Sequence, residues 1–282
     1  MTEISAQLVK QLRDRTGAGM MDAKKALVEA AGDMEKAVDI LRLKGVAKAA
    51  SKGDREANAG VIAVACDGNS GVMVEINSET DFVARNEKFQ AFAEKVLDAA
   101  VKAEGSLEKL LASKLGAEDF NTALTSQIAT TGEKLEVKRS EKIEVKSGAV
   151  VAYIHNKMGA KTGLIGVLLG IESSADKAKI VEVGDQIAMH IAAAAPIALD
   201  AADVPADKLA REKAIAAEKA AASGKPAEIV AKMVDGAIRK YYDEVVLLEQ
   251  AFFIDPSKKI KDIVKTISPD AKITEFLRYQ IG

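Results

Sequence analysis

The N-terminal region up to Gly45 shows the hydrophobic spacing of three short helices. In the first helix, apolar side chains recur every fourth residue, and Gly17 can end it in a left-handed conformation. The second is predicted from Met21 to Ala31, and Asp33 can cap the third. The apolar positions of the first and third helices are Ile4, Leu8 and Leu12, and Met34, Ala37, Val38 and Leu41. Helices this short predict a small domain near the lower size limit for independent folding.

A linker is predicted after these helices, between Lys44 and Ala59, because Ala, Lys, Gly and Asp dominate this segment. Its basic residues allow an RNA-binding interpretation, and they are Lys44, Lys48, Lys52 and Arg55. No aromatic residue stands among them to stack on bases. A solvated tether is therefore the prediction for this segment.

The following region alternates apolar and polar residues, which predicts two strands joined by a tight turn and followed by a helix. The elements are a strand from Gly60 with Ile62, Val64 and Cys66 on one face, a turn over 67–71, a strand to Asn77, a helix with Phe89, Phe92, Ala93, Val96, Leu97 and Ala100 on one face, shorter helical segments over 107–115 and 120–128, and a strand over 135–145. Because Cys66 shares a face with Val64, we expect it to be buried as a small apolar residue.

The same order of elements begins again at Gly148. The elements are a strand to His155, a loop over 156–163, a strand over 164–171, a long helix through Ile180, Val183, Ile187 and Ile191, and a final strand over 272–281. Such a recurrence predicts an α+β fold with a duplicated core of two subdomains.

The second copy contains an insertion that predicts a protruding antiparallel helical hairpin. Two segments rich in Ala, Lys and Glu, over 206–222 and 227–242, flank the sequence Ser223–Pro226. Gly and Pro at that point predict a sharp reversal of the chain. Its expected apolar stripe, facing the partner helix, is Ile229, Met233, Ala237 and Tyr241.

Composition excludes several classes of function. The length of 282 residues is too great for one small core, and the 4% of aromatic residues, without Trp, disfavours a deep ligand cavity. A net charge of −2 gives no general attraction to nucleic acid or to anionic membranes, so neither is predicted as a direct partner. The lone Cys66 cannot form an intramolecular disulfide, and the segment Met1–Ile4 has no leader pattern, so the cytoplasm is the predicted location. Whether the chain forms a homodimer stays open.

No pattern of catalytic or metal-binding residues stands out. The segment 159–163 resembles the end of a phosphate-binding loop, but it lacks Gly immediately before Lys161 and precedes a predicted strand. His155 and His190 could in principle join Cys66 in a nucleophilic site, but so few such residues make that a remote alternative. His190, within a helix, is expected to be partly buried, and His155, at a strand end, is better placed to contact a partner. We predict neither a catalytic residue nor a metal site.

The segment Thr80–Val83 places a large aromatic residue, Phe82, beside a carboxylate in a connection between a strand and a helix. Connections usually lie at the surface, where an exposed aromatic side chain needs a partner to cover it. Two interpretations remain open at this point. Phe82 either folds back onto its own helix or inserts into another protein. Met20 and Met21, in a glycine-rich connection, offer a similar adaptable contact.

Three segments of the chain resemble signature sequences of the bacterial elongation factor Ts family. They are residues 12–27, residues 75–85 with the Thr80–Val83 segment, and residues 187–193. The resemblance covers essentially the whole chain in order, and the Thr-Asp-Phe-Val segment is highly specific to that family. It implies a ubiquitin-associated-like domain with its linker over 1–53, a core N-subdomain over 54–145, and a core C-subdomain over 146–282 with the hairpin at about 200–245.

The resemblance also implies a function, which is guanine-nucleotide exchange on elongation factor Tu, the GTPase that carries aminoacyl-tRNA. In that function Thr80, Asp81, Phe82 and Val83 form a wedge. Phe82 enters an apolar pocket of the GTPase, and Asp81 disturbs the surroundings of the nucleotide's Mg²⁺. The chain would then be no enzyme and would hold no cofactor, because it acts on the GDP and Mg²⁺ of its partner.

Further contact residues follow from the same resemblance. Those implied in the N-terminal domain are Leu12, Arg13, Thr16, Gly17, Met20 and Met21, and those in the second subdomain are His155, Met189 and His190. The loop predicted over 156–163, which follows His155, is longer than expected for the family. An alternative function is a non-catalytic adaptor, whose N-terminal domain binds other proteins and leaves Thr80–Val83 unused.

Overall fold

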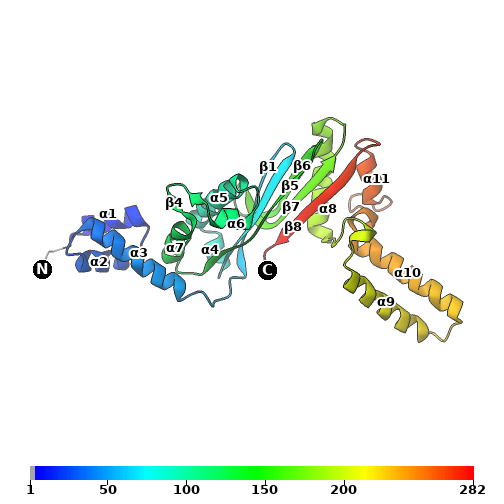
Figure 1. The fold of residues 1–282 in the computed structure, drawn as a ribbon, viewed down its shortest axis with the longest axis horizontal. Helices are drawn as coiled ribbons and strands as arrows, with labels where there is room; N and C mark the ends of the chain where they lie inside the picture. The colour runs from blue at the N-terminus through cyan, green and yellow to red at the C-terminus, as the bar shows by residue number, and fades with distance from the viewer. Residues whose placement is uncertain (1–3) are drawn as a thin grey trace.

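Three helices form a separate body at one end of an elongated molecule (Figure 1). They are α1 (Ala6–Thr16), α2 (Met20–Glu29) and α3 (Met34–Ala50), and they enclose a small apolar core. This structure is a computed structural model that describes residues 4–282. The predicted caps are confirmed, because Gly17 has a φ of 70° and the carboxylate of Asp33 accepts from the backbone N–H of Lys36 at 3.1 Å.

The third helix is longer than predicted, so the prediction of a solvated tether is wrong for residues 46–50. Instead of ending at Gly45, α3 continues to Ala50 and packs against α7 (Phe120–Thr131). Gly45 is buried at this contact, where an added Cβ would lie 3.3 Å from the Cβ of Ala129. Ala and Lys favour a helix once a neighbouring surface stabilises it, and α7 supplies that surface.

The first half of the core contains two long paired strands, a third strand and the helices between them. Its elements are β1 (Ala59–Asp67), β2 (Ser70–Ser78), α4 (Asp81–Ala84), α5 (Glu87–Lys102), α6 (Leu107–Leu111), β3 (Lys114–Leu115), β4 (Glu118–Asp119), α7 and β5 (Leu135–Glu144). The face of α5 predicted to be apolar is buried against β1 and β2.

The second half has the same order of long elements. It contains β6 (Ala149–Lys157), β7 (Thr162–Glu172), α8 (Lys177–Ala194), short 3₁₀ turns over Ala201–Asp203 and Leu247–Glu249, α9 (Ala206–Ala221), α10 (Ala227–Val245), α11 (Ile260–Lys265) and β8 (Lys272–Gln280). Half of the loop predicted over 156–163 is strand, because β6 and β7 pair as far as Lys157 and Gly163 and leave a loop of 158–161. The mixed helix and sheet composition confirms the predicted α+β class.

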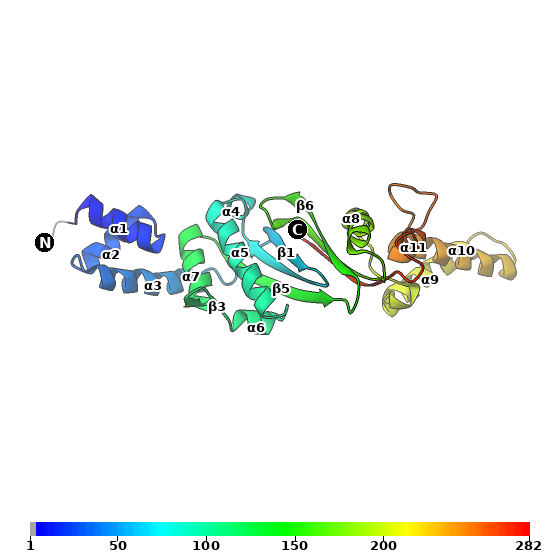
Figure 2. The ribbon, with the colours of Figure 1, turned by 90° about the horizontal axis from the view of Figure 1, so that it is seen from above.

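The six long strands form one bent sheet whose two halves face each other, and the short strands β3 and β4 pair separately. The order is β5-β2-β1-β7-β6 with β8 on β7, but β1 and β7 are paired only through Ile62 with Gly163 and Ala63 with Thr162. The halves enclose an apolar cluster that includes Ile62, Val64, Met73, Ile143, Val145, Val150, Leu168 and Tyr279. Helix α5 covers the outer face of the first half and α8 that of the second (Figure 2). The sheet therefore provides a rigid support between two helical layers.

A charged and aromatic network also joins the halves. The guanidinium of Arg139 on β5 lies 2.6 Å from the buried carboxylate of Glu75 on β2 and 3.7 Å above the ring of Tyr279 on β8. The hydroxyl of Tyr279 donates to the carboxylate of Glu141. Because the buried carboxylate has a cation beside it, the cost of removing its charge from water is offset.

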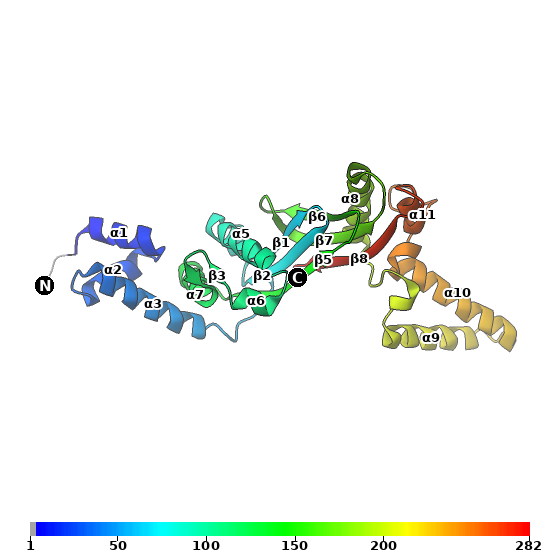
Figure 3. The same cartoon turned by 45° about the horizontal axis from the view of Figure 1, so that its top comes forward.

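Helices α9 and α10 form the predicted hairpin, which projects from the core (Figure 3). The predicted stripe is partly wrong, because Ile229 and Met233 are exposed while Ile238 is buried. Residues four apart drift by about 40° around a helix, so a long i, i+4 series leaves the contact face. The sequence prediction for Cys66 is also wrong. It lies exposed at the end of β1, with its thiol donating to the carbonyl oxygen of Val150 at 2.8 Å.

Candidate partner-binding surface

The Phe82 turn, residues 80–85, presents its aromatic side chain to solvent. Thr80 caps α4, because its hydroxyl accepts from the backbone N–H of Val83 at 3.4 Å. Ala84 is buried, and Val83 packs against the core of the first half. Phe82, between them, is 82% exposed. The interpretation in which Phe82 folds back onto its own helix is therefore wrong, and the ring is accessible to another protein.

The N-terminal side of the Phe82 turn is held by Glu133, in the connection between α7 and β5. Its carboxylate accepts from the backbone N–H of Thr80 at 3.0 Å and from the hydroxyl of Thr80 at 2.6 Å. Glu79 accepts from the backbone N–H of Lys134 at 2.6 Å, and this hydrogen bond is the main cause that lowers the pKa of Glu79. Arg55 adds a contact to Glu79 at 3.2 Å. Hydrogen bonds to carboxylates are among the stronger ones, so the turn is ordered before any partner binds.

The C-terminal side of the turn is held by α5. The side-chain amide of Gln90 donates to the carbonyl oxygen of Ala84, the last residue of α4, at 2.5 Å. Asn86 caps the start of α5. On the surface, the carboxylate of Asp81 lies 3.6 Å from Arg85, with both side chains well exposed. The carboxylate of Asp81 is thus accessible beside the ring of Phe82.

The end of α7 and the residues after it contact both the N-terminal domain and the Phe82 turn. A Cβ added at Gly17 would lie 3.3 Å from the hydroxyl of Thr130, and Glu133 follows three residues later on the turn side. Just beyond Gly17, Met20 and Met21 are 60% and 63% exposed. Residues 130–133 therefore link the two predicted contact segments. Sequence reasoning missed this link because no local pattern marks it.

Two of the residues predicted to contact a partner in this domain instead stabilise the three-helix fold. Leu12 is fully buried in the core of the three helices, so its side chain cannot reach a partner in this conformation. Thr16 is half-buried, and its hydroxyl donates to the carbonyl oxygen of Leu12 at 2.7 Å. Arg13, in contrast, is exposed next to Asp14.

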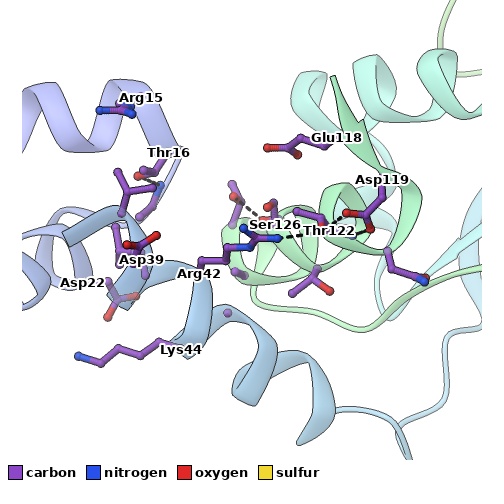
Figure 4. Close-up of a pocket in the computed structure, with 18 of the residues that line it drawn as sticks. Arg15, Thr16, Asp22, Asp39, Arg42, Lys44, Glu118, Asp119, Thr122 and Ser126 are labelled. Carbon is purple, nitrogen blue, oxygen red and sulfur yellow. Dashed lines mark hydrogen bonds between the residues drawn. The ribbon is translucent and has the colours of Figure 1, made fainter. Parts of the chain in front are cut away.

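A cleft of about 1000 Å³ separates the N-terminal helices from α7 (Figure 4). Its walls contain both signs of charge, with Arg15 and Arg42 on the helical domain and Asp119 on the core. These groups already have partners. Arg15 binds Glu35 at 2.6 Å, Arg42 lies 3.5 Å from the Thr122 hydroxyl, and Asp119 caps α7. These three charged groups of the cleft are therefore engaged within the chain.

His155 is exposed near the end of β6, at the same end of the sheet as the Phe82 turn. Its Nδ1 lies 3.1 Å from the hydroxyl of Tyr153. The end of β2 lies opposite the start of β1, and the middle of β1 pairs with the start of β7 next to the β6–β7 hairpin. Gln90 hydrogen-bonds both Ala84 of the Phe82 turn and Thr162 of this hairpin, so the hairpin that contains His155 lies near the turn.

Met189 and His190, on α8, differ in exposure. Met189 is 40% exposed, but His190 is buried and its Nε2 lies 2.9 Å from Oε1 of Gln250. Gln250 uses its own Nε2 to donate to the carbonyl of Glu244, so Oε1 is an acceptor and Nε2 of His190 carries the proton. Burial lowers the pKa of His190. Its imidazole therefore supports the neighbouring loop, in which Phe253 and Ile254 are exposed and were missed by sequence reasoning.

Two further observations concern metal binding and the thiol of Cys66. Among residues 4–282 no group of three or more His, Cys, Asp and Glu side chains is arranged to hold a metal ion. Cys66 contacts Val150 near the start of β6. His155 lies further along β6, about 16 Å from Val150 at the usual rise per residue of a strand. Although Cys66 is exposed as a residue, partial burial of its sulfur is the main cause that raises the pKa of the thiol, which disfavours a nucleophilic thiolate. In residues 4–282 no helix is long and apolar enough to cross a membrane.

Comparison with known proteins adds a family assignment. A family model described as elongation factor TS matches residues 79–282, starting directly before the Phe82 turn. An elongation factor Ts of Rhodospirillum centenum is 50% identical over 100% of this chain and 94% of its own length. Similar proteins of Bartonella bacilliformis and Caulobacter vibrioides are 50% and 45% identical over 99% and 100% of this chain, and 93% of their own lengths.

Proposed function

The chain belongs to the elongation factor Ts family, and from this premise we propose that the Phe82 turn is the element with which it acts on its partner. It is a guanine-nucleotide exchange factor for elongation factor Tu and takes part in protein biosynthesis. Membership of this family does not favour the adaptor alternative. What remains to be proposed is which residues perform the exchange.

Exchange requires tighter binding to the nucleotide-free GTPase than to the nucleotide-bound GTPase. By linkage, the factor then weakens nucleotide binding by the same ratio. No covalent step is needed, so the chain acts through contacts alone. A contact made only in the nucleotide-free state contributes to exchange, while one made equally in both states contributes only to binding.

The observation that supports the Phe82 turn most strongly is a side chain 82% exposed on a backbone held at both ends. Insertion of a Phe side chain into an apolar pocket contributes roughly 2–3 kcal/mol. Because the turn is already ordered, little conformational entropy is lost on docking. Asp81, exposed beside Phe82, would place a negative charge near the phosphates and Mg²⁺ of the GTPase, where it competes with the nucleotide.

One wedge is insufficient for a large effect, so we assign the remaining binding to two flanking surfaces. In the N-terminal domain, the exposed residues Arg13, Met20 and Met21 form the contact, while Leu12, Thr16 and Gly17 shape it. In the second half, His155 and Met189 are accessible and His190 supports them. Few such residues usually dominate the energy of an interface.

We further propose that the core arose as a duplicated unit and that the three N-terminal helices are a ubiquitin-associated-like domain. Each core half follows the order strand, strand, helix, strand. Gly60 is the second residue of β1 and Gly148 directly precedes β6, with φ of 136° and 110°. A Cβ at these positions would lie 2.2 Å and 2.1 Å from the carbonyl oxygens of Ile76 and Ile171. Two glycines with the same unusual contact support a common origin of the halves.

The remaining proposals concern the setting of the protein. We place its action in the cytoplasm, without direct binding of nucleic acid or membrane and without a cofactor of its own. It would act on the GDP and Mg²⁺ held by elongation factor Tu. A homodimer is left as a second assembly state, which sedimentation of the purified chain would detect.

The exchange function is tested through linkage, because the factor and GDP should each weaken the binding of the other to elongation factor Tu. The chain, immobilised on a resin, should retain nucleotide-free elongation factor Tu and release it when GDP and Mg²⁺ are added. In solution it should accelerate the release of fluorescent GDP from the GTPase. Retention that does not respond to GDP, together with an unchanged rate of release, would contradict the exchange function.

A further inference from the structure

The side chain of Gln90 joins two segments that are far apart in the sequence, the Phe82 turn and the β6–β7 hairpin. Its Nε2 donates to the carbonyl oxygen of Ala84 at 2.5 Å, and its Oε1 accepts from the hydroxyl of Thr162 at 2.5 Å. Since a carbonyl oxygen can only accept, the contact with Ala84 fixes which end of the amide faces each segment. Both polar ends of Gln90 are therefore occupied.

The hairpin is seated tightly on this amide. Thr162 is fully buried, and its carbonyl oxygen accepts from the backbone N–H of Met158 at 2.9 Å, which closes the hairpin loop. Met158 packs against the core of the first half. A Cβ added at Gly159 would lie only 2.7 Å from both Oε1 of Gln90 and the hydroxyl of Thr162. The approach therefore requires a residue without a side chain at position 159.

The same hairpin contains His155, so Gln90 connects two proposed contact points. We propose that Gln90 is a positioning residue for nucleotide exchange, which holds the Phe82 turn and the β6–β7 hairpin in one arrangement so that both meet the GTPase together. This inference rests on the proposed role of the Phe82 turn. Glu133 orders the other end of the turn from the first half of the core, whereas Gln90 ties the turn to the second half.

Three substitutions separate the two hydrogen bonds of Gln90. Thr162→Val removes the hydroxyl and keeps the shape of the side chain, so the link to the hairpin is lost and the link to Ala84 stays. Gln90→Leu removes both links. Thr162→Ser keeps the hydroxyl and serves as the rescue variant. Each is compared with the wild type by release of fluorescent GDP from elongation factor Tu over a range of factor concentrations.

We expect Thr162→Val to lower the maximal rate of GDP release by about threefold to tenfold, the effect of losing one ordinary hydrogen bond. Gln90→Leu, which removes both hydrogen bonds, should lower the rate at least as much. The concentration for half-maximal rate should change by less than about twofold, because the flanking contacts that assemble the complex are retained. Thr162→Ser should restore most of the rate. The double variant should be no slower than Gln90→Leu, since both act through one link.

The control is Lys161→Gln on the same hairpin, where the exposed lysine makes only a 3.9 Å ion pair with Asp98. It should exchange like the wild type. If Thr162→Val and Gln90→Leu lower only the melting temperature and leave the rate per folded molecule unchanged, Gln90 is a packing residue and the inference is overturned. Phe82→Ala, measured in parallel, tests the premise separately, because a normal rate in that variant would overturn the role of the turn itself.

Discussion

Replacement of Phe82 by Ala separates exchange activity from folding more cleanly than any other single change. The side chain is 82% exposed, so its removal should alter the free energy of unfolding by less than about 0.5 kcal/mol. If Phe82 is buried in the complex, its loss removes roughly 2–3 kcal/mol of interaction. Converted at 1.36 kcal/mol per decade, this is a decrease of roughly 30-fold to 150-fold in kcat/KM for GDP release.

The assay is stopped-flow release of fluorescent GDP from elongation factor Tu, combined with a thermal melt of each variant. Val101→Ala is the matched control, because Val101 is an exposed apolar residue at the opposite end of α5. It should leave both measurements unchanged. Asp81→Ala should cost less than Phe82→Ala unless displacement of Mg²⁺ is the dominant contribution. An unchanged rate for Phe82→Ala, or a collapse of its fold, would refute the reasoning.

Three further changes test other parts of the structure. Glu133→Ala removes the carboxylate that accepts from the N–H and the hydroxyl of Thr80. We expect GDP release to be about threefold to tenfold slower, the effect of about one net hydrogen bond, with little change in melting temperature. A normal rate would show that the Phe82 turn is ordered without Glu133. Gly60→Ala and Gly148→Ala should each cost about 2–5 kcal/mol in urea unfolding, because the new Cβ meets a carbonyl oxygen at a φ that L-residues rarely adopt; wild-type stability in either would contradict this geometry. Burial lowers the pKa of His190, so the unfolded chain binds a proton at this residue more readily, and the free energy of unfolding should fall as the pH drops below about 6.5. The decrease in this free energy between pH 7 and 5 should be smaller in His190→Asn. Equal decreases in the two proteins would exclude His190 as the source.

Local signals in the sequence were sufficient for most element boundaries. Gly17 ends α1 through a positive φ, and the alternation from Ile62 to Ile76 marks β1 and β2, since both depend on residues adjacent in the chain. The extension of α3 past Gly45 could not be predicted in this way. It depends on α7, which lies far away in the sequence and provides the covering surface.

The candidate surface shows the same division. Its motif located Phe82, but the choice between a buried and an exposed ring depended on Glu133 and Gln90, which are not recognisable as partners from sequence. The burial of Leu12 was foreseeable, because it continues the apolar spacing of Ile4 and Leu8. The burial of His190 was expected in part, and its contact with Gln250 came from tertiary packing alone.

The continuous helix α3 makes the angular placement of the N-terminal domain a matter of helical phase. Its first turns belong to the three-helix core and its later turns rest on α7. A single residue inserted between these parts would rotate the whole domain by about 100° and advance it by about 1.5 Å. Met20 and Met21 would then be rotated by the same angle relative to the Phe82 turn. An insertion of two full turns, or about seven residues, would restore the original orientation of the domain but move it about 10 Å outward. The helix therefore sets both the orientation of the N-terminal domain and its distance from the core.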